Sequence, residues 1–123
     1  MEINDITEKI LFCAYRVHSE LGPGMLERAY EDCLAYELRQ EGLMVEQQKE
    51  LPLIYKEIYI PTGYKLDLMV EGKVVVEIKS VEAFNEVHLA QILTYLKLSK
   101  SKIGLLLNFN VKSLRTGIKR VAL

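Results

Sequence analysis

Cysteine is scarce in this sequence, and the two that occur, Cys13 and Cys33, lie far apart in segments of helical spacing. There is no Cys-x-x-Cys pair and no cluster of cysteine with histidine, which argues against a zinc site. The simplest interpretation is two reduced cysteines that pack in the core.

Long apolar runs are also missing, because no run approaches the roughly 20 residues that span a bilayer. The N-terminus is acidic and lacks the basic segment of a signal peptide. We therefore expect a cytoplasmic protein without membrane association. The length of 123 residues, half of them hydrophobic, suits one ordinary domain. Since no repeat, linker or low-complexity tract interrupts it, we predict a single domain over residues 1–123.

Acidic side chains are absent after Glu86, although the net charge of the whole chain is only −1. This polarity allows a basic face for a polyanion, with Lys100 and Lys102 as candidates for contacting it. A solvated C-terminal surface without a partner explains the same pattern. The basic residues of segment 97–123 are Lys97, Lys100, Lys102, Lys112, Arg115, Lys119 and Arg120.

Apolar spacing predicts helices first, then an antiparallel meander, then one more helix and strand. This order indicates an α/β architecture with a mixed central sheet flanked by helices. The expected helices cover residues 6–21, 26–38 and 85–99, and the expected strands cover 51–55, 58–60, 64–70, 73–79, 103–108 and 118–123.

Two apolar strands carry charged side chains near their ends. Glu77 and Lys79 end one of them, and they share a face because strand residues two apart point the same way. Asp67 interrupts the preceding strand between two leucines. Burying a lone carboxylate is costly unless it is paired or bound to metal. The three side chains therefore form either a structural salt bridge or part of a metal site.

A phosphodiester substrate would favour the metal hypothesis. Oxygen ligands from one or two carboxylates are how Mg²⁺ is usually held. A bound metal lowers the pKa of water and neutralises phosphate charge. A nearby lysine can orient or deprotonate that water, or stabilise developing negative charge.

The loop between the two strands decides whether the carboxylates can meet. With a two-residue loop, Asp67 and Glu77 would face opposite sides of the sheet. A three-residue loop of residues 70–72 places Gly72 in the left-handed conformation and restores a shared face. We therefore predict a three-residue loop or a bulge, with Asp67 opposite Val75.

Polar residues also interrupt two expected helices. His88, Gln91 and Tyr95 form one stripe beside the apolar face of the third helix. Glu27 falls in the first turn of the second helix, where the helix dipole alone would favour a carboxylate.

Together these motifs resemble the GxxExxY family, a small-domain branch of the PD-(D/E)XK nuclease superfamily. The residues that carry the resemblance are Gly24, Glu27 and Tyr30, the stretch 63–67 ending in Asp67, Glu77-Ile78-Lys79, Gln91 with Tyr95 as in the QxxxY motif of RecB-like nucleases, and the strand 105–110. The motifs occur in the expected order over nearly the whole chain. The resemblance implies a restriction-endonuclease-like fold.

The resemblance also implies a metal-dependent nuclease that hydrolyses DNA, with RNA as an alternative, through metal-activated water. Mg²⁺ or Mn²⁺ would be held by Asp67, Glu77 and the Ile78 carbonyl, with Glu27 as a further acid. Lys79 would position or activate the water. Gln91 and Tyr95 would hold the lysine or a substrate phosphate. Separately from the resemblance, the polar stripe makes His88 a candidate for contacting the substrate.

Two other hypotheses stay open. A catalytically silent module could keep the fold and bind nucleic acid or protein, which the small size and acidic N-terminal part allow. A purely structural dimerisation domain is a third, because small nucleases of this fold often act as homodimers.

Overall fold

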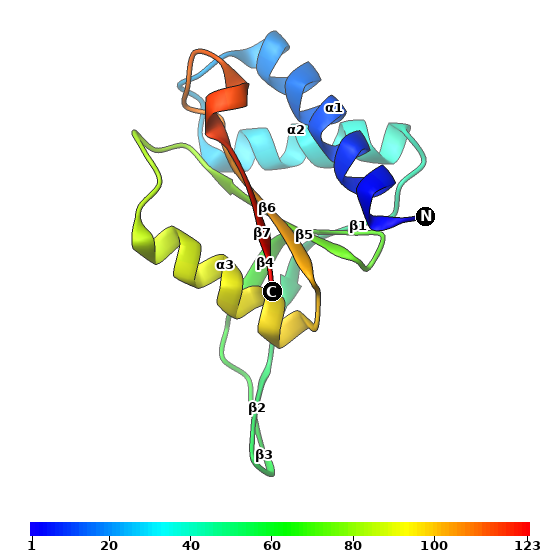
Figure 1. Ribbon diagram of the computed structural model, residues 1–123, viewed down its shortest axis with the longest axis vertical. Helices are drawn as coiled ribbons and strands as arrows, with labels where there is room; N and C mark the ends of the chain where they lie inside the picture. The colour runs from blue at the N-terminus through cyan, green and yellow to red at the C-terminus, as the bar shows by residue number, and fades with distance from the viewer.

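A five-stranded mixed sheet forms the centre of the computed structural model, which describes all 123 residues (Figure 1). Neighbouring strands are antiparallel except for one parallel pair, β5 and β6. The predicted α/β class with a mixed sheet is therefore confirmed. In spatial order the strands are β1 (Val45–Glu50), β4 (Lys65–Val70), β5 (Val74–Lys79), β6 (Ile103–Asn108) and β7 (Ile118–Ala122).

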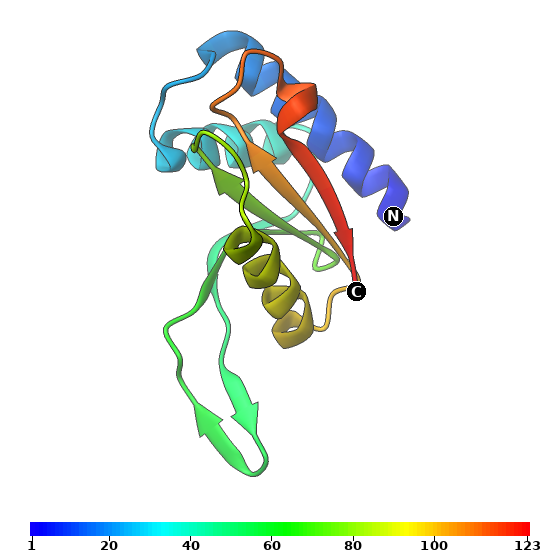
Figure 2. The same ribbon diagram turned by 60° about the vertical axis from the view of Figure 1, so that its left-hand side comes forward.

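Helices cover both faces of this sheet (Figure 2). Helices α1 (Ile3–Leu21) and α2 (Glu27–Gln40) pack on one face, where Val76 and Ile78 join the larger apolar core. Helix α3 (Glu86–Ser99) packs on the other face, against Val75 and its neighbours. The period of two along β5 thus divides its side chains between two layers. Each buried valine or isoleucine stabilises the fold by roughly 1.5–3 kcal/mol.

The connections explain this arrangement. Strands β5 and β6 are parallel, so the chain must cross over between them, and α3 is that crossover. A short 3₁₀ turn, η1 (Leu114–Gly117), leads into the edge strand β7. None of the three helices combines the length and apolarity needed to cross a membrane.

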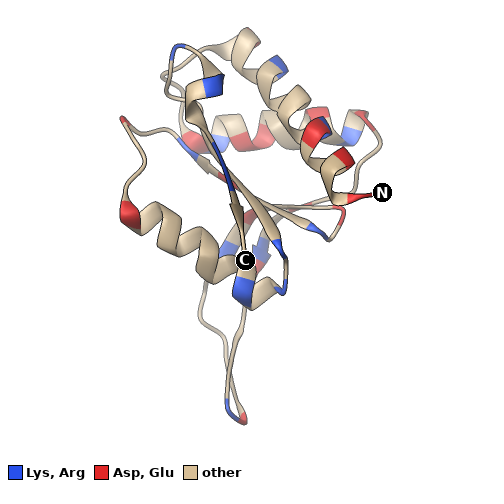
Figure 3. Cartoon of the chain, in the orientation of Figure 1, with Lys and Arg blue, Asp and Glu red and all other residues tan.

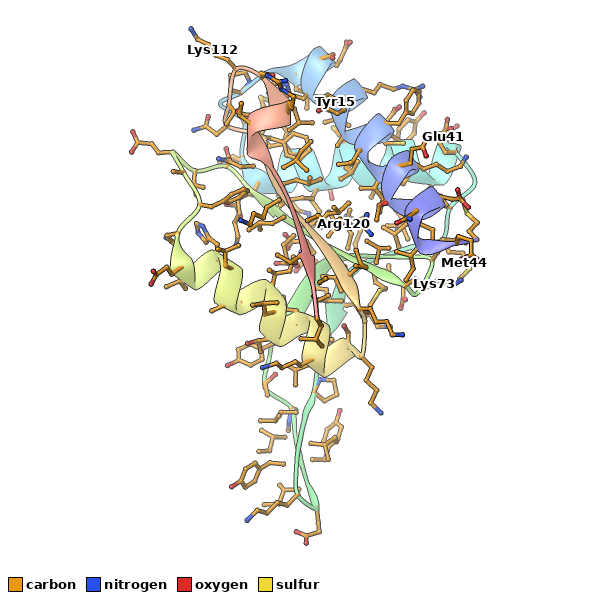
Figure 4. All side chains as sticks on the ribbon, viewed as in Figure 1. Tyr15, Glu41, Met44, Lys73, Lys112 and Arg120 are labelled. Carbon is orange, nitrogen blue, oxygen red and sulfur yellow. The ribbon has the colours of Figure 1, made fainter.

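A two-stranded arm extends away from the body of the molecule (Figures 1 and 2). It consists of β2 (Leu53–Tyr55) and β3 (Ile58–Ile60), and its side chains project into solvent on both sides (Figure 4). Ile54 and Tyr59 are 61% and 63% exposed. An isolated hairpin of this size is only marginally stable in water, so the arm contributes little to the stability of the sheet.

Strand β1 is the element that the sequence analysis did not predict. Most of its side chains are polar, and it pairs only with β4 at the edge of the sheet. A strand with this composition has no apolar alternation to reveal it. The omission matters for function, because β1 carries two glutamines that reach the candidate site.

Candidate active site

The hairpin that joins β4 to β5 places the two central carboxylates together. Leu68 pairs with Val76 and Val70 with Val74, so the loop has three residues, as predicted. The loop consists of residues 71–73 rather than 70–72. The pair that closes it is Val70 with Val74, whereas the predicted loop required Met69 opposite Lys73. Gly72 has φ 64° and takes the left-handed conformation. Continuing this register brings Asp67 opposite Glu77, not opposite Val75 as we predicted.

Asp67 and Glu77 each bond to the main chain of the other strand. The main-chain N–H of Asp67 donates to Glu77 Oε2 at 2.8 Å, and the N–H of Ile78 donates to Asp67 Oδ2, also at 2.8 Å. The carboxylates therefore take the places that main-chain carbonyls occupy in a regular ladder. Glu77 is only 4% exposed, and Asp67 is half-buried.

The electrostatic environment of this pair is unfavourable to negative charge. Burial, followed by the charge of Asp67, raises the pKa of Glu77 from 4.5 to about 8. Burial is also the main cause that raises the pKa of Asp67. No Lys, Arg or His nitrogen lies within ion-pair distance of either carboxylate. The positive charge of Lys79 lowers both pKa values, but it does not offset the effect of burial.

Glu31 is a third acid at this place, and the sequence analysis missed it. It lies on α2, is 3% exposed, and its negative charge contributes to the raised pKa of both Asp67 and Glu77. Side-chain amides from β1 donate to both of its oxygens. Its position beside Tyr30 on the inward stripe of the second helix was the available signal, because an acid there needs a partner.

Glu27 has a different environment. Its Oε2 accepts a hydrogen bond from the N–H of Ser80, directly after Lys79, and the Ser80 hydroxyl donates to the carbonyl of Met25. Its side chain is exposed and makes no hydrogen bond to the carboxylate pair. The structure therefore places Glu27 at the rim of the site, where it fastens the start of α2 to the segment after β5.

Tyr30, the last residue of the same motif, stabilises the loop before α2. Its hydroxyl donates to the carbonyl of Gly22 at 2.5 Å and accepts from the N–H of Met25 at 3.0 Å. Its ring stacks on Phe109 with centroids 4.6 Å apart. Together with Glu27, Tyr30 gives the motif Gly-x-x-Glu-x-x-Tyr a clear structural part in forming this corner of the molecule.

Lys79 lies beside α3. Its Nζ donates to Gln91 Oε1 at 3.4 Å. Tyr95 is 6% exposed, and its pKa is raised by burial first and then by the charges of Glu77 and Asp67. The structure thus brings the lysine, the glutamine and the tyrosine to one side of the carboxylates, while their roles remain predictions.

His88 has a local partner in the structure. It forms a capping box at the start of α3, in which the N–H of Asn85 donates to His88 Nδ1 and the N–H of His88 donates to Asn85 Oδ1. The hydrogen-bonding capacity of His88 Nδ1 is therefore already used within the protein. The predicted contact between His88 and substrate is untested.

The basic residues of the last quarter of the chain do not converge on the site. Lys100 ends α3, and Lys102 lies near Gly72 at the turn end of the β4–β5 hairpin. Figure 3 shows basic residues at the end of α3, along β7 and in the segment that leads into β7. Arg120 points toward α1 (Figure 4) and donates to Thr7 and Asn4. The single basic face that the charge pattern allowed is not formed near Asp67.

Comparison with protein families matches residues 4–121 to the PD-(D/E)XK nuclease superfamily. This chain belongs to that superfamily. Searches of curated proteins and of solved structures gave no match. Membership agrees with the restriction-endonuclease-like arrangement of three helices around a mixed sheet. It favours a nucleic-acid substrate and nuclease activity.

Nucleases of this superfamily generally depend on a divalent metal. No three His, Cys, Asp or Glu side chains are grouped closely enough here to hold a metal ion. The donors at the site are nevertheless carboxylate and carbonyl oxygens, which suit Mg²⁺ or Mn²⁺. Because burial makes negative charge on Asp67 and Glu77 unfavourable and no ion pair offsets it, the chemistry of this pair fits such an ion. Glu31 is a further acid here, because its charge acts on Asp67 and the amide of Gln48 contacts both side chains.

Proposed function

We propose that residues 1–123 form one metal-dependent nuclease domain that hydrolyses phosphodiester bonds. DNA is the proposed substrate, and RNA is the alternative. The observation that carries this proposal is the pair of a buried Glu77 and a half-buried Asp67 on adjacent strands, each bonded to the main chain of the other strand, with no ion pair to either carboxylate. Such a pair attracts a hard divalent cation, which would offset the charge that burial makes unfavourable. The resemblance further supports the GxxExxY branch of the superfamily.

Mg²⁺ or Mn²⁺ would be held by Asp67, Glu77 and the Ile78 carbonyl. Glu27 and Glu31 would be further acids near the metal. When bound, the metal would lower the pKa of a water and neutralise charge on the phosphate. Lys79 would orient or deprotonate the attacking water, or stabilise negative charge on the phosphate.

The residues on α3 would orient that lysine. Gln91 accepts from Lys79 Nζ, which limits the positions that the amine can reach. Tyrosine is protonated at neutral pH, and burial raises the pKa of Tyr95 further, so its hydroxyl remains a donor for a phosphate oxygen.

Cleavage of plasmid and of labelled single- and double-stranded oligonucleotides, in Mg²⁺, Mn²⁺ or EDTA, tests the proposal. Lys79→Ala and Asp67→Ala should each lower the rate at least 100-fold. Lys112→Ala is the matched control, because Lys112 points away from the molecule (Figure 4), and it should cleave like the wild type. Metal-dependent cleavage that survives in Lys79→Ala would contradict the assigned role.

A second candidate function is a binding module on the same fold. The absence of a closed group of three metal-ligating side chains favours it. If the folded wild type binds oligonucleotide in a mobility-shift assay yet cleaves none with either metal, this function replaces the nuclease. Sedimentation at two concentrations would separately test the predicted homodimer.

A further inference from the structure

Gln48 has an unusual backbone conformation in the middle of β1. Its φ is 50°, in the left-handed region that residues other than glycine rarely adopt. The neighbouring residues pair normally with β4, Gln47 with Leu68 and Lys49 with Leu66. Gln48 therefore lies opposite Asp67, where the register is otherwise continuous. Such strain persists only where surrounding contacts impose it, and it clusters at functional sites.

The conformation turns the Gln48 side chain toward the carboxylates. In a regular strand, Gln47 and Gln48 would point to opposite faces, yet both donate to Glu31. Gln48 Nε2 lies 2.7 Å from Glu31 Oε1 and 3.3 Å from Asp67 Oδ1. Because carboxylate oxygens are acceptors, the amide must present its NH₂ group to them.

We propose that Gln48 is a positioning residue whose side-chain amide competes with a divalent cation for the oxygens of Glu31 and Asp67. The inference rests on the proposed nuclease function and assigns a new role within its site. The partial positive charge of the NH₂ group stabilises both carboxylates when no cation does so. Asp67 and Glu31 are also among the acids that would hold the cation in the proposed function.

The distances explain why the amide and the cation exclude one another. Oxygen ligands lie roughly 2.0–2.6 Å from Mg²⁺ or Ca²⁺, closer than the 2.7 and 3.3 Å at which Gln48 Nε2 lies from its acceptors. For a cation to bind these oxygens at such distances, the amide of Gln48 would have to leave them. The terminal torsion of glutamine has a broad energy profile, so the amide can turn away easily.

Calorimetric titration with Mg²⁺ at pH 8.0 tests the competition without measuring cleavage. Gln48→Met keeps the length of the side chain and removes the NH₂ group. We expect it to bind Mg²⁺ about tenfold more tightly than the wild type, since hydrogen bonds to charged acceptors no longer oppose binding. Affinity that stays equal or falls would overturn the inference, and a fall would identify Gln48 as a supporting ligand.

Gln47→Met is the matched control. Gln47 Nε2 donates to Glu31 Oε2 at 2.9 Å and to Asp32 Oδ1 at 2.8 Å, but it does not bond to Asp67. Its loss loosens Glu31 without removing the group that links the two acids. We expect an affinity within about twofold of the wild type. An equal gain in both variants would overturn the specific role of Gln48.

A second measurement uses the wild type and does not depend on how the variants fold. In ¹⁵N-labelled protein, Mg²⁺ should shift the side-chain NH₂ signals of Gln48 and speed their hydrogen exchange more than those of Gln47. Unchanged Gln48 signals at saturating Mg²⁺ would overturn the inference while leaving the metal site intact. If the wild type binds no Mg²⁺, the proposed metal site itself fails, and the inference fails with it.

Discussion

The two ends of the β4–β5 hairpin differ although the strands are the same. At the turn end, Met69 pairs with Val75 in a regular main-chain ladder, and helices cover their apolar side chains. At the open end, the side chains of Asp67 and Glu77 accept the main-chain N–H groups instead. Main-chain pairing and apolar packing therefore hold the strands together at the turn end, whereas hydrogen bonds to carboxylates join them at the open end.

The difference teaches how a buried acid is tolerated. Main-chain donors satisfy the oxygens at the open end, but they do not neutralise charge, and the raised pKa of Glu77 records the remaining penalty. At the turn end, Met69 and Val75 are instead buried among apolar side chains. An acid at Val75, two residues from Glu77 along β5, should therefore destabilise the fold far more than Glu77 does.

Val75→Glu is the strongest test of this contrast. Val75 is fully buried against α3, and it lies on the same face of β5 as Glu77. An unpaired carboxylate there should lower the free energy of unfolding by about 4 kcal/mol or more, enough to unfold a marginal domain. Urea denaturation followed by circular dichroism measures the effect. A loss below about 1 kcal/mol would show that both ends tolerate acids equally.

Leu68→Ala tests the packing of the turn end. Leu68 is fully buried in the core beneath α1 and α2, so the change leaves a cavity and should cost about 2–5 kcal/mol. Ile54→Ala on the exposed arm is the control and should change the free energy of unfolding by less than about 0.5 kcal/mol. Similar losses in the two variants would contradict the assignment of the arm as a minor contributor.

The open end should make stability depend on pH. The pKa of Glu77 rises from 4.5 in the unfolded chain to about 8 in the fold. Between about pH 5 and pH 8 the folded state holds the proton that the unfolded state has released, so the free energy of unfolding falls as pH rises. Above pH 8 both states are ionised and the dependence ends. The raised pKa of Asp67 acts in the same direction.

Glu77→Gln isolates this contribution. Glutamine keeps an oxygen that can accept from the N–H of Asp67, but it carries no charge. In urea denaturation from pH 5 to pH 8 with EDTA, the variant should lose most of the slope that the wild type shows and should be the more stable protein at pH 8. Parallel slopes in the two proteins would place the titrating group elsewhere.

Much of this site was predictable because strand geometry is strict. The period of two fixed the shared face of Glu77 and Lys79, and parity alone required an odd loop near Gly72. The alternation of side chains along β5 and the helical spacing around Gln91 and Tyr95 are set by neighbouring residues that pack in the core. Such residues leave a periodic trace in the sequence.

Other features left no such trace. Strand β1 is a polar edge strand, so nothing in its composition alternates. The left-handed conformation of Gln48 occurs where no glycine indicates it. Glu31 is a different case, because its place beside Tyr30 on the inward stripe of α2 was a signal, and the choice of Glu27 followed the motif instead.

Gly72→Ala gives the smallest expected effect and tests whether the two ends are independent. A Cβ at this position would meet no atom within 4 Å, so only the φ of 64° opposes the change. We expect a loss of about 1 kcal/mol in the free energy of unfolding, measured against Lys73→Ala in the same loop. Metal-dependent cleavage should remain within about twofold of the wild type, because the strain arises at the end away from Asp67. A larger fall in cleavage with little loss of stability would mean that the turn sets the register of the carboxylates directly, and the two ends would then act as one unit.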